Sequence, residues 1–163
     1  MEFVTGQLIA FGKAQIEAGA DVIAISDPSG TGEILGPKYF KEFAVTYLNK
    51  LLDGLQTAGL GTIVHICGHM GSVYNEINEV KSSALSFDSV VPMKEARAHL
   101  HDRVLMGNVS TYTLEFGEPE RVAVLTKNCV KNGSDIISPA CGLGMKSPIK
   151  NIQAILKCLS EEA

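Results

Sequence analysis

The chain has 163 residues, of which 45% are hydrophobic and 20% are charged, a composition typical of a soluble globular protein with a core of its own. The formal net charge is −4 and the sequence contains no run of Lys and Arg, which argues against nucleic acid or an anionic membrane as the main partner. No apolar stretch reaches the roughly 18 to 20 residues that span a bilayer, and residues 1–5 do not resemble a secretion signal. We therefore expect a single cytoplasmic domain, residues 1–163.

Hydrophobic periodicity divides the chain into alternating helices and strands. Apolar residues at helical spacing predict helices over residues 3–18, 37–57, 72–80, 93–100, 119–132 and 149–160. Short runs rich in apolar and β-branched residues predict strands over residues 21–26, 61–66, 84–88, 103–108 and 135–138. Gly19 and Gly133 are expected to end two of the helices, and a polar loop is expected between residues 108 and 119.

Strands that alternate with helices pair in parallel through right-handed crossovers, so the chain belongs to the α/β class. A doubly wound sheet and a TIM-type (β/α) barrel both satisfy this order. The strand ends favour the barrel, because polar and ligand-type residues follow every predicted strand, as they do at the mouth of a barrel. These residues are Ser26, Asp27, His65, Cys67, Asp88, Asn108 and Cys141.

Five strand–helix units fall short of a complete barrel, which has eight units in about 250 residues. The sequence therefore predicts a partial barrel, corresponding to its C-terminal part. Five strands alone would leave two unpaired edges, which soluble proteins normally cover. Dimerisation, a partner chain or rearrangement into an open sheet are the three ways in which these edges are expected to be covered.

The segment 62–69, Thr-Ile-Val-His-Ile-Cys-Gly-His, carries the strongest chemical signal. Side chains alternate between the faces of a strand, so His65 and Cys67 leave the strand end on the same side and one metal ion can contact both. Cys141 follows another strand-like run and supplies a third soft ligand. Three protein ligands with an open fourth position are the pattern of a catalytic zinc site.

The remaining cysteines and histidines have simpler interpretations. Cys129 and Cys158 stand among the apolar residues of helical patterns and are expected to pack in the core. His69 is interpreted as a loop residue, and His99 and His101 as part of a solvated helix end.

Three polar residues at strand ends are further site candidates. Asp88 either orients a bound thiol or another site group, or caps the helix that follows. Asn108 either hydrogen-bonds substrate or secures the loop before Ser110, and Asp27 either acts as a cap or lies in the mouth of the cavity. We assign Asp88 a catalytic role and Asp27 and Asn108 substrate binding.

The chain resembles the methylcobamide:coenzyme M methyltransferase branch of the uroporphyrinogen decarboxylase superfamily, in its C-terminal part. The resemblance rests on motifs that occur in the family's order over nearly the whole chain. They are Asp27-Pro-Ser, Ile34-Leu-Gly-Pro-Lys-Tyr-Phe-Lys-Glu-Phe43, His65-Ile-Cys-Gly68, Leu85-Ser-Phe-Asp88, Gly107-Asn-Val-Ser110 and Ser138-Pro-Ala-Cys-Gly142. The decarboxylases of the superfamily share the fold but lack the His-x-Cys pair and the distant Cys.

The resemblance implies zinc bound by His65, Cys67 and Cys141, with the thiolate of coenzyme M as a further ligand. It also implies a methylated corrinoid protein as partner and methyl donor, and methanogenesis as the setting. Two alternatives remain open. One is a catalytically incomplete zinc-binding half-barrel that needs a partner chain, and the other is a tetrapyrrole binder of the decarboxylase type in which the cysteines are incidental.

Overall fold

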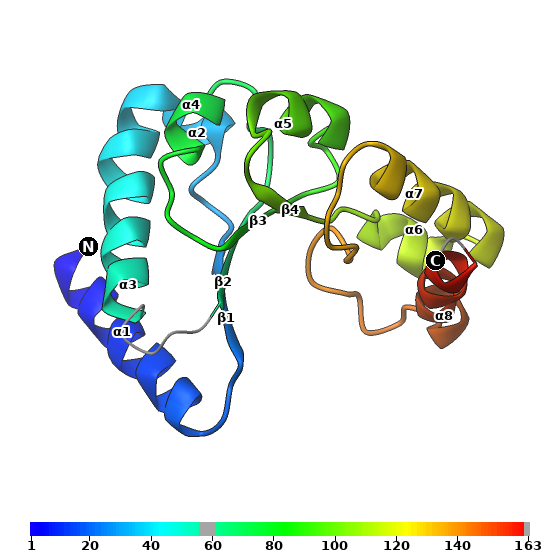
Figure 1. The fold of residues 1–163 in the computed structure, drawn as a ribbon, viewed down its shortest axis with the longest axis horizontal. Helices are drawn as coiled ribbons and strands as arrows, with labels where there is room; N and C mark the ends of the chain where they lie inside the picture. Colours follow the sequence, from blue (N-terminus) through cyan, green and yellow to red (C-terminus); the bar gives the residue numbers. More distant parts are fainter. Residues whose placement is uncertain (56–60, 162–163) are drawn as a thin grey trace. The chain divides into compact units, whose positions relative to one another are not determined.

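The computed structural model describes residues 1–55 and 61–161. Its contacts group the chain into two compact units, Met1–Leu85 and Ser86–Ala163, and each is described by itself. Along the chain the elements are α1 (Glu2–Glu17), β1 (Val22–Asp27), α2 (Gly32–Tyr39), the π-helical η1 (Phe40–Val45), α3 (Thr46–Leu55), β2 (Gly61–Ile66), α4 (Tyr74–Ile77), β3 (Ala84–Phe87), α5 (Met93–His99), β4 (Val104–Met106), α6 (Thr111–Phe116), α7 (Pro119–Lys131) and α8 (Ile149–Ser160) (Figure 1).

The strands follow chain order in the sheet, β1-β2-β3-β4, with helices between them. β1 and β2 pair in parallel, from Val22 opposite Gly61 to Asp27 opposite Ile66. This confirms the parallel α/β class and four of the five expected strands, with shifts of a few residues at their ends. The expectation of a single domain stays a prediction.

The expected fifth strand, residues 135–138, is wrong as a continuous strand. This segment follows β4 in parallel through two isolated bridges, Met106 with Ile136 and Val109 with Pro139. Gly107 lies between the bridges with a φ of 135°, which takes the chain out of the extended conformation, and Pro139 has no N–H to donate. The position and direction of the segment are as expected, but the ladder is interrupted.

The helix expected from Pro37 begins earlier and is divided into three parts. Thr31 caps α2, because its hydroxyl accepts a 3.3 Å hydrogen bond from the N–H of Ile34. Gly36 then breaks the helical conformation with a φ of 63°, and Pro37 begins the next helical stretch. The expected end near Thr57 lies outside the described residues.

Two short helices also differ from expectation. The helix expected over residues 72–80 is reduced to α4, and the polar loop expected between Asn108 and Pro119 contains α6. Ser110 caps the start of α6, and the buried Asn151 of α8 donates hydrogen bonds to the carbonyl oxygens of Leu114 (3.1 Å) and Gly117 (2.8 Å). Because this second cap comes from a distant segment, local sequence does not reveal the helix.

Each unit has an apolar cluster. In the first, Ile23 of β1 packs against Leu51 and Leu55 of α3, with Ile9 and Ile16 of α1 beside them. In the second, the clustered residues come from α6, α7, α8 and the segment after β4, and they are Val109, Leu114, Val122, Cys129 and Ile155. Each buried aliphatic side chain of this kind contributes about 1.5–3 kcal/mol.

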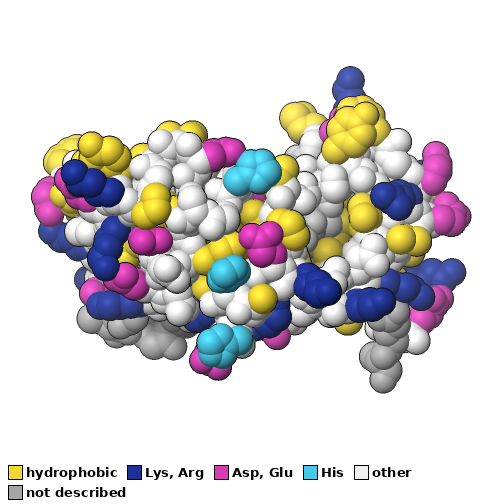
Figure 2. All heavy atoms as spheres, turned by 90° about the horizontal axis from the view of Figure 1, so that it is seen from above, with side chains coloured by type: hydrophobic (Ala, Val, Ile, Leu, Met, Phe, Trp, Pro, Cys, Tyr) yellow, Lys and Arg dark blue, Asp and Glu magenta, His cyan; other side chains and the backbone are white. Residues whose placement is uncertain are grey.

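The surface carries mixed charge. On the face shown in Figure 2, Lys and Arg side chains are interspersed with Asp and Glu, and no wide area has a single sign. Within the part of the chain that the structure describes, no helix combines the length and apolar character needed to cross a lipid bilayer.

Candidate functional site

β2 places His65 and Cys67 on the same side of the first unit. Burial alternates along the strand, with Thr62, Val64 and Ile66 buried and His65 only partly covered. Cys67 continues this alternation, and its Sγ lies 3.4 Å from Nε2 of His65. The expectation that the two side chains leave the strand end together is confirmed.

The separation of these two atoms suits one metal ion. Zn–N bonds of about 2.0–2.1 Å and Zn–S bonds of about 2.3 Å place two ligand atoms of a tetrahedral ion roughly 3.6 Å apart. Nε2 of His65 and Sγ of Cys67 are 3.4 Å apart, and an imidazole nitrogen with a thiolate is a donor pair that zinc favours. Two of the three predicted ligands therefore fit zinc by distance and by chemistry.

Gly68 allows the loop after Cys67 to pass close to the start of α2. Its φ is 77°, and a Cβ atom there would lie 2.6 Å from Oε1 of Glu33 and 3.0 Å from Cγ2 of Thr31. His69, the next residue, has Nε2 3.9 Å from Oε2 of Glu33, and both side chains are exposed. This placement agrees with the interpretation of His69 as a loop residue. Glu33 was not singled out in the sequence, because only the fold brings it beside this loop.

Asp27 closes the turn that follows β1. Its Oδ1 accepts hydrogen bonds from the N–H groups of Ser29 (3.1 Å) and Gly30 (2.8 Å). A Cβ at Gly30 would lie 2.3 Å from Oδ2 of Asp27, so a larger residue there would displace this carboxylate. Oδ2 itself accepts no hydrogen bond from the described residues, so one carboxylate oxygen remains for a ligand.

Asp88 has the same arrangement after β3, in the second unit. Its Oδ1 accepts from the N–H of Val90 and the hydroxyl of Ser89, both at 3.2 Å. The carboxylate thereby stabilises the turn that precedes α5. The expected capping of the helix itself is wrong, because the N-cap of α5 is Pro92 and no side chain caps it. The Oδ2 atom of Asp88 has no hydrogen bond among the described residues.

Asn108 secures a neighbouring loop. Its Nδ2 donates two 2.8 Å hydrogen bonds, to the carbonyl oxygens of Asp88 and Val91, and its backbone N–H donates to Sγ of Cys129 at 3.4 Å. The side-chain donors of Asn108 are thus used within the protein. The sequence anticipated a loop-securing role, but assigned it to the loop before Ser110 rather than to the loop after β3.

Asn108 also lines a cavity of about 190 Å³ in the second unit. Other polar side chains around it, Ser89, Ser110, Asn128 and Asn132, come from three segments of the chain. Asn128 lies in α7 and Asn132, four residues later, directly follows its end, a helical spacing that predicts a shared face but no particular chemistry. Neither asparagine was therefore predicted as a site residue.

Cys141 lies in the second unit, directly after the segment that follows β4. The N–H of Ala140 donates to the carbonyl oxygen of Val109 at 2.8 Å, so this pairing ends one residue before Cys141. The side chain is exposed. Its expected position at the exit of a strand-like segment is confirmed, and its role as a zinc ligand stays a prediction.

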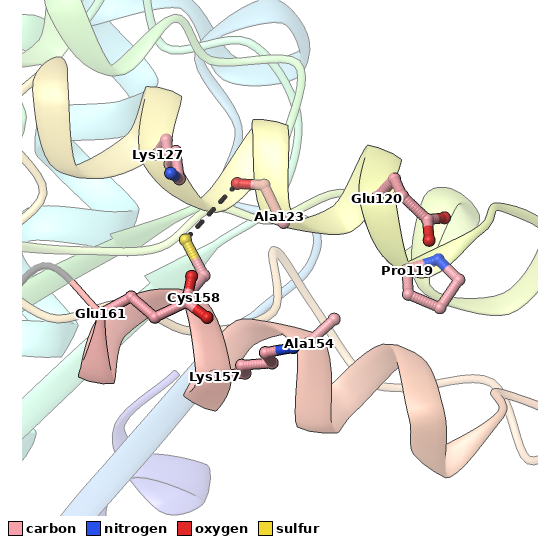
Figure 3. A pocket seen from close by; sticks show the side chains of 8 residues that line it. All are labelled: Pro119, Glu120, Ala123, Lys127, Ala154, Lys157, Cys158 and Glu161. Carbon is pink, nitrogen blue, oxygen red and sulfur yellow. Dashed lines mark hydrogen bonds between the residues drawn. The ribbon is translucent and has the colours of Figure 1, made fainter.

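The two other cysteines are buried, as expected. Burial raises the pKa of the Cys129 thiol, an effect that the Asn108 N–H partly offsets, and the group is therefore a neutral thiol at physiological pH. Cys158 lines a groove of about 230 Å³ between α7 and α8, where its Sγ donates to the carbonyl oxygen of Ala123 at 3.6 Å (Figure 3). Both thiols serve packing rather than reaction.

The histidine pair near the end of α5 is exposed. His101 pairs with the adjacent Asp102 at 2.9 Å, and His99 faces solvent on the same helix end. This arrangement fits the expected solvated surface.

The chain has parallel strands that alternate with helices, and polar residues follow the strand ends. This arrangement defines an α/β protein of the barrel class. Residues 1–162 match the family described as uroporphyrinogen decarboxylase (URO-D). The chain belongs to this family, which confirms the resemblance found in the sequence.

Within the family, the chain is similar to individual proteins that are described as methyltransferases. The chain is 30% identical over 159 residues to the methylcobamide:CoM methyltransferase MtbA of Methanosarcina acetivorans, covering 97% of this chain and 47% of that protein. It is 31% identical over 156 residues to the methylcobamide:CoM methyltransferase MtaA of Methanosarcina barkeri, covering 94% of this chain and 45% of that protein. A solved methyltransferase from Methanosarcina mazei matches with a TM-score of 0.89 at 28% identity, covering 97% of this chain and 47% of that chain.

The chain therefore spans about half the length of the relatives it matches. This agrees with the expectation of a partial barrel.

Proposed function

We propose that this chain is the zinc-binding part of a methyltransferase that moves a methyl group from a methylated corrinoid protein to a thiol such as coenzyme M. The observation that carries the proposal is the His65–Cys67 pair, whose ligand atoms are 3.4 Å apart at the end of β2. The similarity to methyltransferases named for methylcobamide and CoM supplies the substrate class.

In this proposal His65, Cys67 and Cys141 hold the zinc ion, and the substrate thiol takes the fourth position. When bound, zinc lowers the pKa of a coordinated thiol, so that the thiolate forms near neutral pH. Two cysteine thiolates and a neutral imidazole already balance the charge of the ion. This donor set therefore leaves electron density on the substrate sulfur, which stays nucleophilic.

The group transfer balances as a displacement on carbon. The thiol first releases a proton, and its sulfur lone pair then forms an S–C bond to the methyl group of the corrinoid. The Co–C bond breaks, and its electron pair remains on cobalt, which leaves as cob(I)amide. The products are a methyl thioether and a corrinoid protein ready to be methylated again.

Three strand-end residues complete the proposed site. Asp88 is the proposed catalytic residue and orients the thiol through Oδ2, the oxygen that the turn after β3 leaves unused. Asp27 is proposed to contact substrate in the same way. Asn108 is proposed as a substrate-binding residue at the polar cavity, where it also holds the Asp88 loop in place.

A second candidate function is zinc binding without turnover, in a half-barrel that needs further βα units for catalysis. The observation that favours it is the length of the chain, about half that of its relatives. Both candidates require the same metal ligands. They differ in whether the isolated chain transfers a methyl group.

Metal analysis tests the ligand set. Protein purified without chelator is expected to contain close to one zinc per chain by plasma mass spectrometry. His65→Ala, Cys67→Ser and Cys141→Ser should each remove most of it, whereas Cys158→Ser, at a buried thiol outside the proposed site, should retain it. Absence of zinc in the parent protein, or full zinc in the Cys141→Ser variant, would contradict the proposal.

Thiol binding and turnover then separate the two candidates. Titration calorimetry in two buffers of different ionisation enthalpy should show that coenzyme M binds the zinc form with release of about one proton. Free methylcobalamin can replace the corrinoid protein as methyl donor, and formation of the methyl thioether would support the first candidate. Thiol binding with proton release but without product would support the second.

A further inference from the structure

The cavity beside Asn108 is polar but has no ionised side chain in its wall. It measures about 190 Å³, and its lining residues all belong to the second unit. None of the described residues that line it is Asp, Glu, Lys, Arg or His, and the Cys129 thiol is neutral because burial raises its pKa. A charged group would enter this cavity without a counter-charge, which is costly. The cavity therefore fits a neutral polar group.

The side chains around the cavity offer both donors and acceptors of hydrogen bonds. Asn128 and Asn132 form no side-chain hydrogen bond with another described residue, so each amide keeps two N–H donors and a carbonyl acceptor. Oδ1 of Asn108 meets only the weak S–H donor of Cys129, at 3.7 Å, and Ser110 adds a hydroxyl. A primary carboxamide has two donors and one acceptor of its own, so it can use both kinds of group.

The size and the apolar part of the lining indicate how much of a ligand enters. Val91, Met93 and Leu125 complete the wall and can contact the methylene groups that carry an amide. Pockets that enclose a whole molecule of drug size usually measure about 300–1,000 Å³. A cavity of about 190 Å³ is smaller, so it admits one amide-terminated side chain while the rest of the ligand stays outside.

The cavity adjoins the loop that carries Asp88. Ser89 lines the cavity, and its hydroxyl donates to Oδ1 of Asp88 at 3.2 Å. Asn108, also in the wall, holds the same loop through its bonds to the carbonyl oxygens of Asp88 and Val91. Asp88 is proposed above to orient the substrate thiol, so the methyl donor must come to this loop as well. A corrin ring carries primary carboxamides along its edge, in acetamide and propionamide side chains.

We propose that this cavity, defined by Asn108, Ser110, Asn128 and Asn132, binds one carboxamide side chain of the corrinoid and so fixes the ring beside the Asp88 loop. The corrinoid as the source of the carboxamide rests on the proposed function. An Asn or Gln side chain of a protein partner carries the same chemical group, and the experiments below distinguish the two sources.

Nuclear magnetic resonance with small probes tests the chemical class of the ligand. Propionamide is expected to shift the side-chain NH₂ signals of Asn128 and Asn132 in a saturable manner. Propionate and 1-propanol are controls of similar size and should shift them far less, because propionate is charged and 1-propanol has a single hydroxyl. No response to propionamide, or equal responses to the three probes, would overturn the proposal.

Equilibrium dialysis of cyanocobalamin, followed by the absorbance of the corrin ring, tests the source of the carboxamide. Asn128→Ala and Asn132→Ala should each weaken binding about tenfold, because each removes hydrogen bonds to the amide. Gln153→Ala is the matched control, since it removes a carboxamide from an exposed position of α8 outside the cavity. Its affinity for cyanocobalamin should equal that of the parent protein.

Both experiments use metal-free protein and need no turnover, so their outcome is separate from the zinc and methyl-transfer tests of the proposed function. Circular dichroism of the variants, compared with the parent, shows that the fold is intact. Absence of measurable cyanocobalamin binding to the parent protein would overturn the proposal. Equal affinity of the parent and both asparagine variants would also overturn it, even if propionamide binds, because the carboxamide would then not come from the corrinoid.

Discussion

The side-chain amide of Asn108 donates a 2.8 Å hydrogen bond to the carbonyl oxygen of Asp88, so that the second residue after β4 holds the first residue after β3. A second 2.8 Å bond from the same nitrogen reaches the carbonyl oxygen of Val91 at the other end of that loop. The loop that presents the Asp88 carboxylate is therefore fixed from both ends by one side chain.

Asn108→Ala should lower the free energy of unfolding by roughly 2–4 kcal/mol, since it leaves two partly buried carbonyl oxygens without a donor. Urea unfolding followed by circular dichroism measures this change. The matched control is Asn49→Ala, because Asn49 also joins two backbone groups, the carbonyl of Glu79 and the N–H of Lys81, but on the exposed surface. The control should cost less than about 1 kcal/mol. Equal losses for the two variants would contradict the role given to Asn108.

Gly68→Ala should lower the free energy of unfolding by about 1–3 kcal/mol. The new Cβ would face Oε1 of Glu33 and the side chain of Thr31, and φ at this position is 77°. Zinc affinity should fall as well, because the loop begins at Cys67. Gly6→Ala is the matched control, since a Cβ in that helical position meets no atom within 4 Å, and it should stabilise the protein by about 0.5–1 kcal/mol. Thermal unfolding and zinc titration measure both effects.

Sequence periodicity was sufficient for the parts of the fold that are determined locally. β2 begins and ends at the predicted residues, and the alternation of its side chains correctly placed His65 beside Cys67. The fifth strand failed because local preference cannot show that Gly107 interrupts the neighbouring strand. Helix α6 was missed because Asn151, far along the chain, caps its end.

The direction in which a helix faces is also not a local property. Helical spacing of apolar residues, Phe3, Leu8 and Phe11 among them, predicted α1 correctly, but in the structure all three side chains are exposed. Of the apolar residues of α1, Ile9 and Ile16 pack against the apolar cluster of the first unit. The pattern shows that the helix has an apolar side, and the fold shows that much of this side lacks a partner among the described residues.

Thiol reactivity offers a test of the proposed ligands that does not require activity. After removal of metal at pH 7, iodoacetamide should modify the exposed Cys141 first and the partly exposed Cys67 next, and leave the buried Cys129 and Cys158 largely unmodified. One equivalent of zinc should slow alkylation at Cys67 and Cys141 together. Peptide mass spectrometry assigns the modified sites. If zinc protected only one of the two thiols, they would not share one ion.

The acid Asp135 should make the second unit sensitive to low pH. Its Oδ2 accepts hydrogen bonds from the guanidinium of Arg97 (2.5 Å) and from the N–H of Leu105 (2.8 Å). Burial pushes the pKa of Asp135 upward, but these bonds and the charge of Arg97 outweigh it, so the pKa lies below its usual value. The carboxylate thus stabilises the folded state fully above the pKa of the unfolded chain, about 3.9. This contribution is lost as the pH falls from about 5 through the lower folded pKa.

Asp135→Asn should therefore lower the free energy of unfolding at pH 7, and the difference from the parent protein should shrink as the pH approaches 3. Because the carboxylate is about half exposed, we expect a difference of at most about 1 kcal/mol. The matched control is Asp53→Asn. Asp53 forms an exposed ion pair with Lys81 but, unlike Asp135, its carboxylate accepts no hydrogen bond from a described backbone N–H. This variant should change the free energy of unfolding by less than about 0.5 kcal/mol at either pH. Urea unfolding at pH 7 and pH 3 provides the comparison. A difference between Asp135→Asn and the parent protein that stays constant between these pH values would show that the hydrogen bonds of Asp135 do not favour its ionised form.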